Sequence, residues 1–146
     1  MEESLSFLQN IKKNFSCDDV DIKTYSPLTL AFLGDCVYDL MIRTIVVNKG
    51  NRAANSLHKT TSSYVKAATQ SAMIEALMDS LSTEEVAIYK RGRNAKSYTS
   101  AKNASIADYR RATGFEALVG YLYLKDDMNR ILELIQIGFE KIEMPI

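Results

Sequence analysis

An apolar run that contains one carboxylate constrains this chain more than any other stretch. In residues 30–39, LAFLGDCVYD, Asp35 is set among side chains that a helix in a folded core would bury. An ionised carboxylate is costly to bury unless it is paired or binds a cation. We therefore expect Asp35 either to face solvent at the edge of the core or to have a partner.

A second apolar run also carries an acid in its middle. Residues 113–121 read TGFEALVGY, and the acid is Glu116. If both runs are helices that pack face to face, Asp35 and Glu116 converge on one hard cation. Magnesium suits such a site because it takes oxygen ligands and retains several waters. The alternative is that both acids lie at the rim of the core with ordinary partners.

The spacing of apolar residues predicts an all-α protein. Ser26-Pro27 is typical of a helix start, and Ser82 with Glu85 matches a capping box. No stretch alternates between apolar and polar residues as a strand would. The helices that we expect are a short one within residues 1–25, then 27–48 with a glycine stop at Gly50, 53–78, one that begins after Ser82 and breaks at 91–94, then 108–124 and 128–142.

Composition excludes several classes of protein. The 146 residues are 47% hydrophobic and carry no net charge, so one domain with a real core is expected and any nucleic-acid surface must come from local clustering. Cys17 and Cys36 are expected to be buried free thiols. The N-terminus lacks the basic start of a secretory signal, and no apolar stretch approaches the ~18 residues of a membrane span. A cytoplasmic location without membrane contact is therefore expected.

Basic residues gather in one segment of this neutral chain. Between Val86 and Arg111 the only acid is Asp108. The basic residues of the segment are Lys90, Arg91, Arg93, Lys96, Lys102, Arg110 and Arg111. Arginine forks and lysine charges suit phosphate oxygens, and Gly92 with Asn94 would let a polyanion approach the backbone closely. The segment predicts binding of one polyanion on one face, and the alternative is a solvated loop.

The sole histidine, His58, limits the chemistry that the chain can perform. Without a second histidine, neither a zinc site nor a Ser-His-Asp arrangement is expected. His58 and its neighbour Lys59 either contact an RNA backbone or lie on the surface without a special role.

Several of these motifs together resemble the ribonuclease III family. Residues 32–37, FLGDCV, look like the signature helix of that family, and residues 115–124, FEALVGYLYL, resemble its second acidic helix. Residues 91–97, RGRNAKS, and 57–61, LHKTT, are similar to the Mini-III subgroup, a catalytic domain that lacks the double-stranded-RNA-binding domain. The resemblance runs from about residue 25 to 142, with the motifs in the expected order.

The resemblance implies a ribonuclease III endonuclease-domain fold in a single helical domain, with Asp35 and Glu116 as the catalytic, metal-binding residues. The cofactor would be Mg²⁺, with Mn²⁺ as a substitute. Full-length ribonuclease III enzymes usually carry two further acids, which would fall at Ala31 and Thr113. Mini-III enzymes resemble this chain in lacking them. Fewer acids put tight binding of two metals in doubt.

The resemblance also implies a homodimer that cuts double-stranded RNA, with Phe32 and Leu33 at the dimer interface. Its products would have 5′-phosphate and 3′-hydroxyl ends, and its substrate would be the precursor of the large-subunit (23S-type) ribosomal RNA. The residues expected to bind RNA are Lys90, Arg91, Arg93, Asn94, Lys96, His58 and Lys59. Two alternatives stay open: a catalytically inactive RNA-binding or ribosome-assembly module on the same fold, and a helical protein-interaction domain without RNA.

Overall fold

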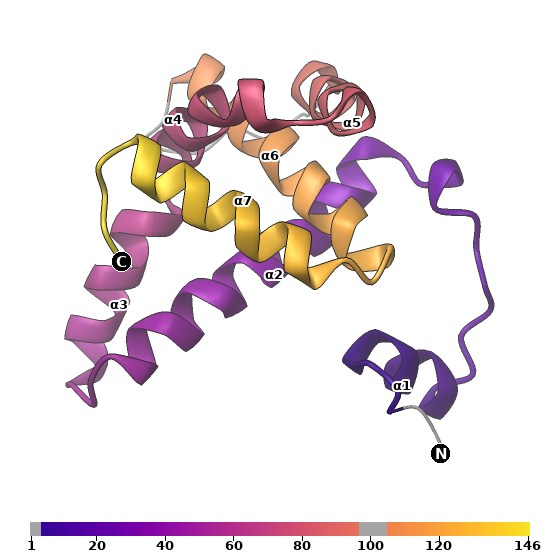
Figure 1. The fold of residues 1–146 in the computed structure, drawn as a ribbon, viewed down its shortest axis with the longest axis horizontal. Coiled ribbons are helices and arrows are strands. Elements are labelled where there is room, and N and C mark those ends of the chain that lie inside the picture. Colours follow the sequence, from indigo (N-terminus) through magenta and orange to yellow (C-terminus); the bar gives the residue numbers. More distant parts are fainter. Residues whose placement is uncertain (1–3, 97–104) are drawn as a thin grey trace.

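The computed structural model describes residues 4–96 and 105–146, and these residues form helices and no strand, which confirms the expected all-α class (Figure 1). The seven α-helices are α1 (Phe7–Asn14), α2 (Pro27–Asn48), α3 (Ala54–Val65), α4 (Ala67–Leu77), α5 (Thr83–Asn94), α6 (Ile106–Leu124) and α7 (Met128–Lys141). Two short 3-10 helices, η1 (Ile22–Thr24) and η2 (Met78–Ser80), lie between them. Figure 1 shows α2 and α6 crossing in the middle of the molecule, with α4, α5 and α7 around them.

The crossing of α2 and α6 is unusually close because glycines lie at it. A Cβ atom on Gly34 would overlap the main-chain carbonyl of Glu116, and one on Gly120 would overlap the carbonyl of Leu30. Any larger residue at these two positions would push the helices apart. The crossing brings the part of α2 around Asp35 against the part of α6 around Glu116.

The core surrounds this crossing. Tyr38 of α2 packs edge to face against Phe115 of α6, with ring centroids 5.3 Å apart, and its hydroxyl donates to the main-chain oxygen of Tyr64 at 2.7 Å. The largest fully buried side chains are Tyr38, Phe115, Leu30, Ile42, Met73, Ile74, Leu77, Leu118 and Ile131. They come from α2, α4, α6 and α7, so four helices share one core.

The helix starts predicted from capping residues are confirmed. The Ser26 hydroxyl accepts from the Thr29 N–H at 3.2 Å ahead of Pro27, and α2 ends at Asn48 as expected. Its end needs no left-handed glycine, since no described glycine has a positive φ. At α5, Ser82 Oγ accepts from Glu85 N at 3.1 Å, and the Glu85 carboxylate accepts from Ser82 N at 2.8 Å.

The expected single helix over 53–78 is wrong, because the chain breaks it at Lys66. Lys66 is extended, with φ −63° and ψ 153°, and it separates α3 from α4. Side chains replace main-chain bonds at the break: Thr69 Oγ1 donates to Ser63 O at 2.7 Å, and Gln70 Nε2 donates to Val65 O at 2.7 Å. These bonds satisfy carbonyls at the end of α3 that a continuous helix would have satisfied itself.

The expected end of this helix within 91–94 is confirmed, because α5 ends at Asn94, but Gly92 is not what ends it. Gly92 is buried inside the helix, and a Cβ atom on it would come within 2.8 Å of the Ala117 Cβ and 2.9 Å of the Gly114 Cα. Here the glycine permits close packing against α6 and does not end the helix. Lys90, Arg91 and Arg93 therefore lie on a helix and not in a loop, and Arg110 and Arg111 lie on α6.

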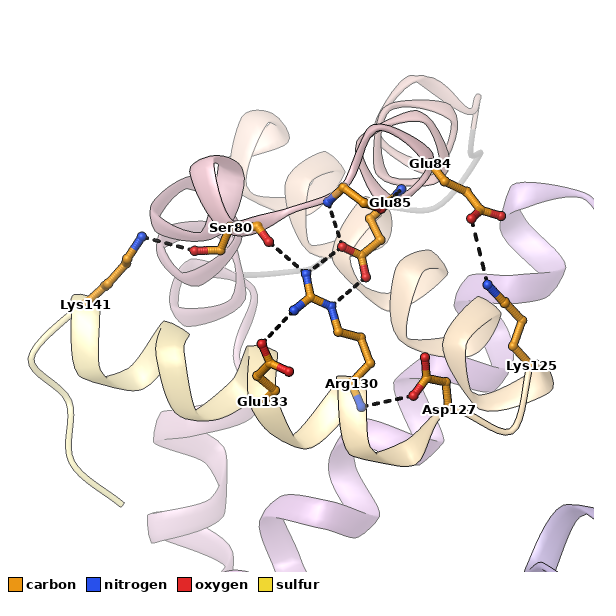
Figure 2. Close-up of polar contacts among 9 residues, drawn as sticks. Ser80, Glu84, Glu85, Lys125, Asp127, Arg130, Glu133 and Lys141 are labelled. Atoms are coloured by element: carbon orange, nitrogen blue, oxygen red, sulfur yellow. Dashed lines mark hydrogen bonds and ion pairs between the residues drawn. The ribbon is translucent and has the colours of Figure 1, made fainter.

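An ion-pair cluster joins α7 to residues of η2 and α5, which lie much earlier in the sequence (Figure 2). The Arg130 guanidinium donates to both carboxylate oxygens of Glu85 at 2.7 and 2.8 Å, to Ser80 O at 2.7 Å and to Glu133 at 2.9 Å. The Glu85 side chain is only 8% exposed, so this pair is screened little by solvent. Hydrogen bonding to Arg130, more than any other cause, holds the pKa of Glu85 below its ordinary value.

Two smaller features complete the fold. Ser6, the N-cap of α1, donates its hydroxyl hydrogen to Asp126 in the turn between α6 and α7 at 2.7 Å. Cys17 and Cys36 are both exposed, so the expectation that they are buried is wrong. Cys36 lies on the solvent side of α2, although its sequence neighbours are apolar. Among the described residues no helix is both long and apolar enough to cross a lipid bilayer.

Candidate functional site

Asp35 and Glu116 come together in one cavity. They lie 81 positions apart in the sequence, yet both line a cavity of about 870 Å³ beside the crossing of α2 and α6. Asp35 is exposed at its mouth, and Glu116 is half-buried. The close glycine crossing explains the meeting, because Asp35 follows Gly34 and Glu116 lies one turn before Gly120.

The cavity is electrostatically unfavourable for an ionised Glu116. Burial, then hydrogen bonding to Asp35 and the negative charge of Asp35, raise the pKa of Glu116 from 4.5 to about 9, while a hydrogen bond from the Gln70 amide lowers it. No Lys, Arg or His side chain is among the described residues that line this cavity. The two acids therefore lack a basic partner there, and a bound cation would supply one.

The donor set fits a hard divalent ion. Carboxylate oxygens are the ligands that Mg²⁺ and Mn²⁺ prefer, and Mg²⁺ keeps several waters, so two carboxylates are enough to hold it. Within the described residues no group of three or more His, Cys, Asp or Glu side chains is arranged to hold a metal. Asp35 and Glu116 are the residues that would hold the ion, with waters as the remaining ligands.

The positions without acids also face this cavity. Ala31 lies one turn before Asp35 and Thr113 three residues before Glu116, and both line the cavity. Ala31 is buried and contributes no polar side chain, and the Thr113 hydroxyl donates to Tyr109 O at 3.0 Å. The site therefore has two acids on its walls, and the side chains of Ala31 and Thr113 add no charge.

The residue that sequence reasoning missed is Gln70. Its side chain lines the cavity with Asp35 and Glu116, and it is 3% exposed. Gln70 begins the series Gln70, Met73, Ile74, Leu77, all buried and spaced as one face of α4. The available signal was a polar residue on a helix face that is otherwise apolar. Because we expected one helix over 53–78, this face was not recognised as the buried face of a separate helix.

The basic residues form a second, separate cavity. Arg93 and Asn94, at the end of α5, and Arg110 and Arg111, at the start of α6, line a cavity of about 300 Å³. The Arg93 guanidinium lies 5.6 Å from the centre of the Tyr89 ring. Lys90, Arg91 and Lys96 are exposed nearby in the chain, and Lys102 lies outside the described residues. The Arg111 guanidinium forms an ion pair with Glu75 at 2.7 Å, so its positive charge is partly neutralised.

The acidic and basic cavities lie on opposite sides of α6. Successive residues of a helix are about 100° apart, so positions 107, 110 and 111 lie on one side and 109, 112, 113 and 116 on the other. The first set lines the basic cavity and the second set the acidic one. The structure therefore does not bring the predicted phosphate-binding residues into contact with the predicted metal ligands; one helix separates them.

His58 and Lys59 are exposed residues of α3 and lie in neither cavity. His58 instead lines a third cavity of about 210 Å³, together with Arg43, Val46 and Leu57 among others. The nearest basic neighbour of His58 in that cavity is thus Arg43 of α2 and not a residue of the α5 cluster.

An apolar stripe runs along the exposed side of α2. Phe32 is 83% exposed, and Leu28, Leu40 and Val47 are also exposed at helical spacing along the same side. Leu33 is only half-buried, and Leu28, Phe32 and Leu33 also line the acidic cavity. Exposed apolar stripes of this kind are typical of protein contact surfaces.

Comparisons with known proteins identify the family of the chain. A sequence model of the ribonuclease III domain matches residues 28–127. The chain is 44% identical over 144 residues to a Mini-ribonuclease 3 of Thermoanaerobacter sp. (strain X514), and this match covers 98% of the chain and 99% of the relative. It is 49% identical over 118 residues to the Mini-ribonuclease 3 of Clostridium tetani, covering 80% of this chain and 78% of that one.

A solved structure shares the fold. A crystal structure of a protein from Fusobacterium nucleatum superposes on this chain with a TM-score of 0.74 at 32% sequence identity, covering 84% of this chain and 98% of that protein.

Proposed function

The chain belongs to the ribonuclease III family, and on that basis we propose that it is a magnesium-dependent endoribonuclease that cuts double-stranded RNA with Asp35 and Glu116. The observation that carries the proposal is the meeting of these two acids, from helices far apart in sequence, in a cavity whose described lining has no basic side chain. Mn²⁺ would take the place of Mg²⁺ because both prefer oxygen ligands.

The roles of the two acids follow from their surroundings. When bound, magnesium activates water and stabilises the charge that develops on the leaving 3′ oxygen. Asp35, which is exposed, and Glu116, which is half-buried, would hold the ion in the cavity that they share. Glu116 has to release its proton for this, and the ion compensates the cost that burial and Asp35 impose on the charged form. The products carry 5′-phosphate and 3′-hydroxyl ends.

RNA would be held through its backbone. Lys90, Arg91, Arg93, Asn94 and Lys96 offer donors to phosphates at the end of α5, and Arg110 and Arg111 add to them. His58 and Lys59 on α3 provide a second backbone contact. The minor groove of duplex RNA displays 2′-hydroxyls and phosphates, so recognition should depend mainly on shape and charge, and binding should weaken markedly as salt increases.

The active form is proposed to be a homodimer. The stripe Leu28, Phe32, Leu40 and Val47 leaves apolar surface on α2 that a second copy would cover, and the contact is proposed to include Phe32 and the half-buried Leu33 beside it. Two subunits would each cut one strand of a duplex. The natural substrate is proposed to be the paired ends of the large-subunit ribosomal RNA precursor in the cytoplasm, in keeping with the similarity to proteins named Mini-ribonuclease 3.

The test is cleavage of a labelled RNA duplex with Mg²⁺, with ends identified by phosphatase and ligation assays. Asp35→Asn and Glu116→Gln should each abolish cleavage. Asp19→Asn is the control, because the Asp19 carboxylate is 95% exposed, is paired with Lys12 at 3.1 Å and is outside the acidic cavity and α2. Cleavage that survives Asp35→Asn, or that proceeds equally in EDTA, would refute the proposal.

A second candidate function has one observation in its favour. Ala31 and Thr113 leave the cavity with two acids, which agrees with a catalytically inactive RNA-binding or ribosome-assembly module. Such a module would bind the duplex without cutting it at any Mg²⁺ or Mn²⁺ concentration. Loss of duplex binding on neutralising Arg91 and Arg93 would in turn exclude a protein-interaction domain without an RNA role.

A further inference from the structure

Gln70 is a buried amide in the wall of the acidic cavity, and its bond to Val65 O at the α3–α4 break accounts for only the nitrogen end of that amide. It takes the first position of the face that continues with Met73, Ile74 and Leu77. A leucine or methionine would fill such a position without burying an amide, which costs free energy wherever a hydrogen bond is missing.

The oxygen of the Gln70 amide lacks a hydrogen bond. Gln70 Nε2 donates to Val65 O at 2.7 Å, and this bond fixes which end of the amide is nitrogen. Gln70 Oε1 has no hydrogen-bond partner, and it is the only fully buried side-chain polar atom among the described residues of which this is true. The side chain is thus anchored at one end but not satisfied as a structural residue.

The second hydrogen of the Gln70 amide nitrogen is available to another acceptor. An amide nitrogen carries two hydrogens, one of which goes to Val65 O. The Gln70 side chain lines the acidic cavity together with Glu116, and its amide lowers the pKa of the Glu116 carboxyl. An N–H group favours the ionised carboxylate as its acceptor, and Asp35, the other close neighbour, disfavours it.

We propose that Gln70 is a positioning residue for the divalent-ion site, which donates to the Glu116 carboxylate and holds it in the orientation that binds the ion. The extended Lys66 places Gln70 there, because the break lets α4 start beside the end of α3, where Val65 O anchors the amide. Groups that hold metal-binding carboxylates in this way typically change metal affinity by 10–100-fold when removed. The inference rests on the proposed metal site of Asp35 and Glu116.

The test measures binding of Mn²⁺ alone to the protein, with no RNA present. Electron paramagnetic resonance quantifies the free ion, and calorimetry gives an independent dissociation constant. Gln70→Met keeps the volume of the side chain and removes both its donor and its unsatisfied oxygen. The dissociation constant for Mn²⁺ should rise about 10-fold or more. The thermal midpoint of the metal-free protein should stay within about 4 °C of wild type, because the loss of the Val65 bond is offset by removal of a buried unsatisfied oxygen.

Thr69→Val is the matched control. Thr69 makes the neighbouring bond across the same break, to Ser63 O, but does not line the cavity. Its Mn²⁺ affinity should stay within about twofold of wild type, whatever happens to its stability. If Thr69→Val weakens Mn²⁺ binding as much as Gln70→Met does, Gln70 acts only by stabilising the α3–α4 connection and the proposal is overturned.

A further comparison separates the role of Gln70 from the metal site itself. Asp35→Asn tests the site itself: if it loses Mn²⁺ while Gln70→Met binds like wild type, only the role of Gln70 fails. If Asp35→Asn still binds Mn²⁺ normally, the proposed metal site fails.

Discussion

Gly34 of α2 lies against the main chain of Glu116 in α6, so closely that a methyl group on Gly34 would overlap the Glu116 carbonyl. The contact joins the two stretches that carry the acids of the proposed site. The position of Asp35 relative to Glu116 therefore depends on a glycine next to Asp35.

Gly34→Ala should destabilise the protein and impair the site together. The added methyl meets main-chain atoms, which cannot move aside as a side-chain end can, so we expect a loss of about 3 kcal/mol in the free energy of unfolding. Urea denaturation measures it. Gly50→Ala is the control, because nothing lies within 4 Å of a Cβ there and its φ is not positive, and it should be neutral or slightly stabilising.

Arg130→Met should unfold the protein more easily at neutral pH and change its response to acid (Figure 2). It removes the partner of a Glu85 side chain that is 8% exposed, which should cost about 3 kcal/mol. Because Arg130 lowers the pKa of Glu85, the stability from this pair is present above about pH 4.5 and is lost as the pH falls below it.

The stability difference between Arg130→Met and wild type should therefore shrink in acid, as followed by urea denaturation at several pH values. Lys12→Met removes the exposed pair with Asp19, whose carboxylate is 95% exposed, and should cost well under ~1 kcal/mol at every pH. A constant difference between Arg130→Met and wild type down to pH 3 would contradict the assignment of Glu85.

Glu116→Gln should stabilise the metal-free protein as the pH rises. A carboxyl whose pKa is raised by folding contributes its stability below the unfolded value of 4.5, and loses it between that value and about 9. Glutamine carries no charge to bury, so its advantage should grow across this range and reach the order of a few kcal/mol.

Thermal unfolding in EDTA from pH 4 to 9 measures this advantage. Adding Mg²⁺ should stabilise wild type but not Glu116→Gln, because only the carboxylate binds the ion. Glu140→Gln, at an exposed position of α7, is the control and should leave the profile parallel to that of wild type. Parallel profiles for Glu116→Gln would contradict the burial of a charged group in the cavity.

Arg110→Gln should weaken binding of duplex RNA and make it less sensitive to salt. Arg110 lines the basic cavity and is exposed, so its guanidinium is available to a phosphate. Loss of one phosphate contact should reduce the slope of log K against log salt by about 1. Binding to a catalytically inactive Asp35→Asn background, measured from 50 to 300 mM salt, tests it. Lys13→Gln, on α1, should leave the slope unchanged.

Local signals in the sequence predicted much of the fold. The caps of α2 and α5 depend on residues that neighbour one another, so Ser26-Pro27 and the Ser82–Glu85 box could be read directly. The break at Lys66 could not, because the bonds that compensate for it come from the side chains of Thr69 and Gln70. Gly92 was wrongly expected to break α5. It is helical because close contact with α6 outweighs its low helix propensity.

The candidate site was predictable to the extent that it consists of charges placed among apolar residues. Asp35 and Glu116 stood out because acids are rare inside such runs, and the structure places them in one cavity. Gln70 did not stand out, since an uncharged polar side chain in a helix is ordinary until its burial is known. The separation of the acidic and basic cavities by α6 depends on how α2, α3, α4 and α5 pack around it, which no local pattern contains.

The two acids of the cavity limit how much positive charge its walls can balance. With Asp35 and Glu116 both ionised and no basic side chain among the described lining residues, the walls carry two negative charges, which one divalent ion balances. A second ion would bring an excess of positive charge that this protein does not offset. On the proposed metal site, a second ion would therefore need negative charge that the described walls of the cavity do not supply.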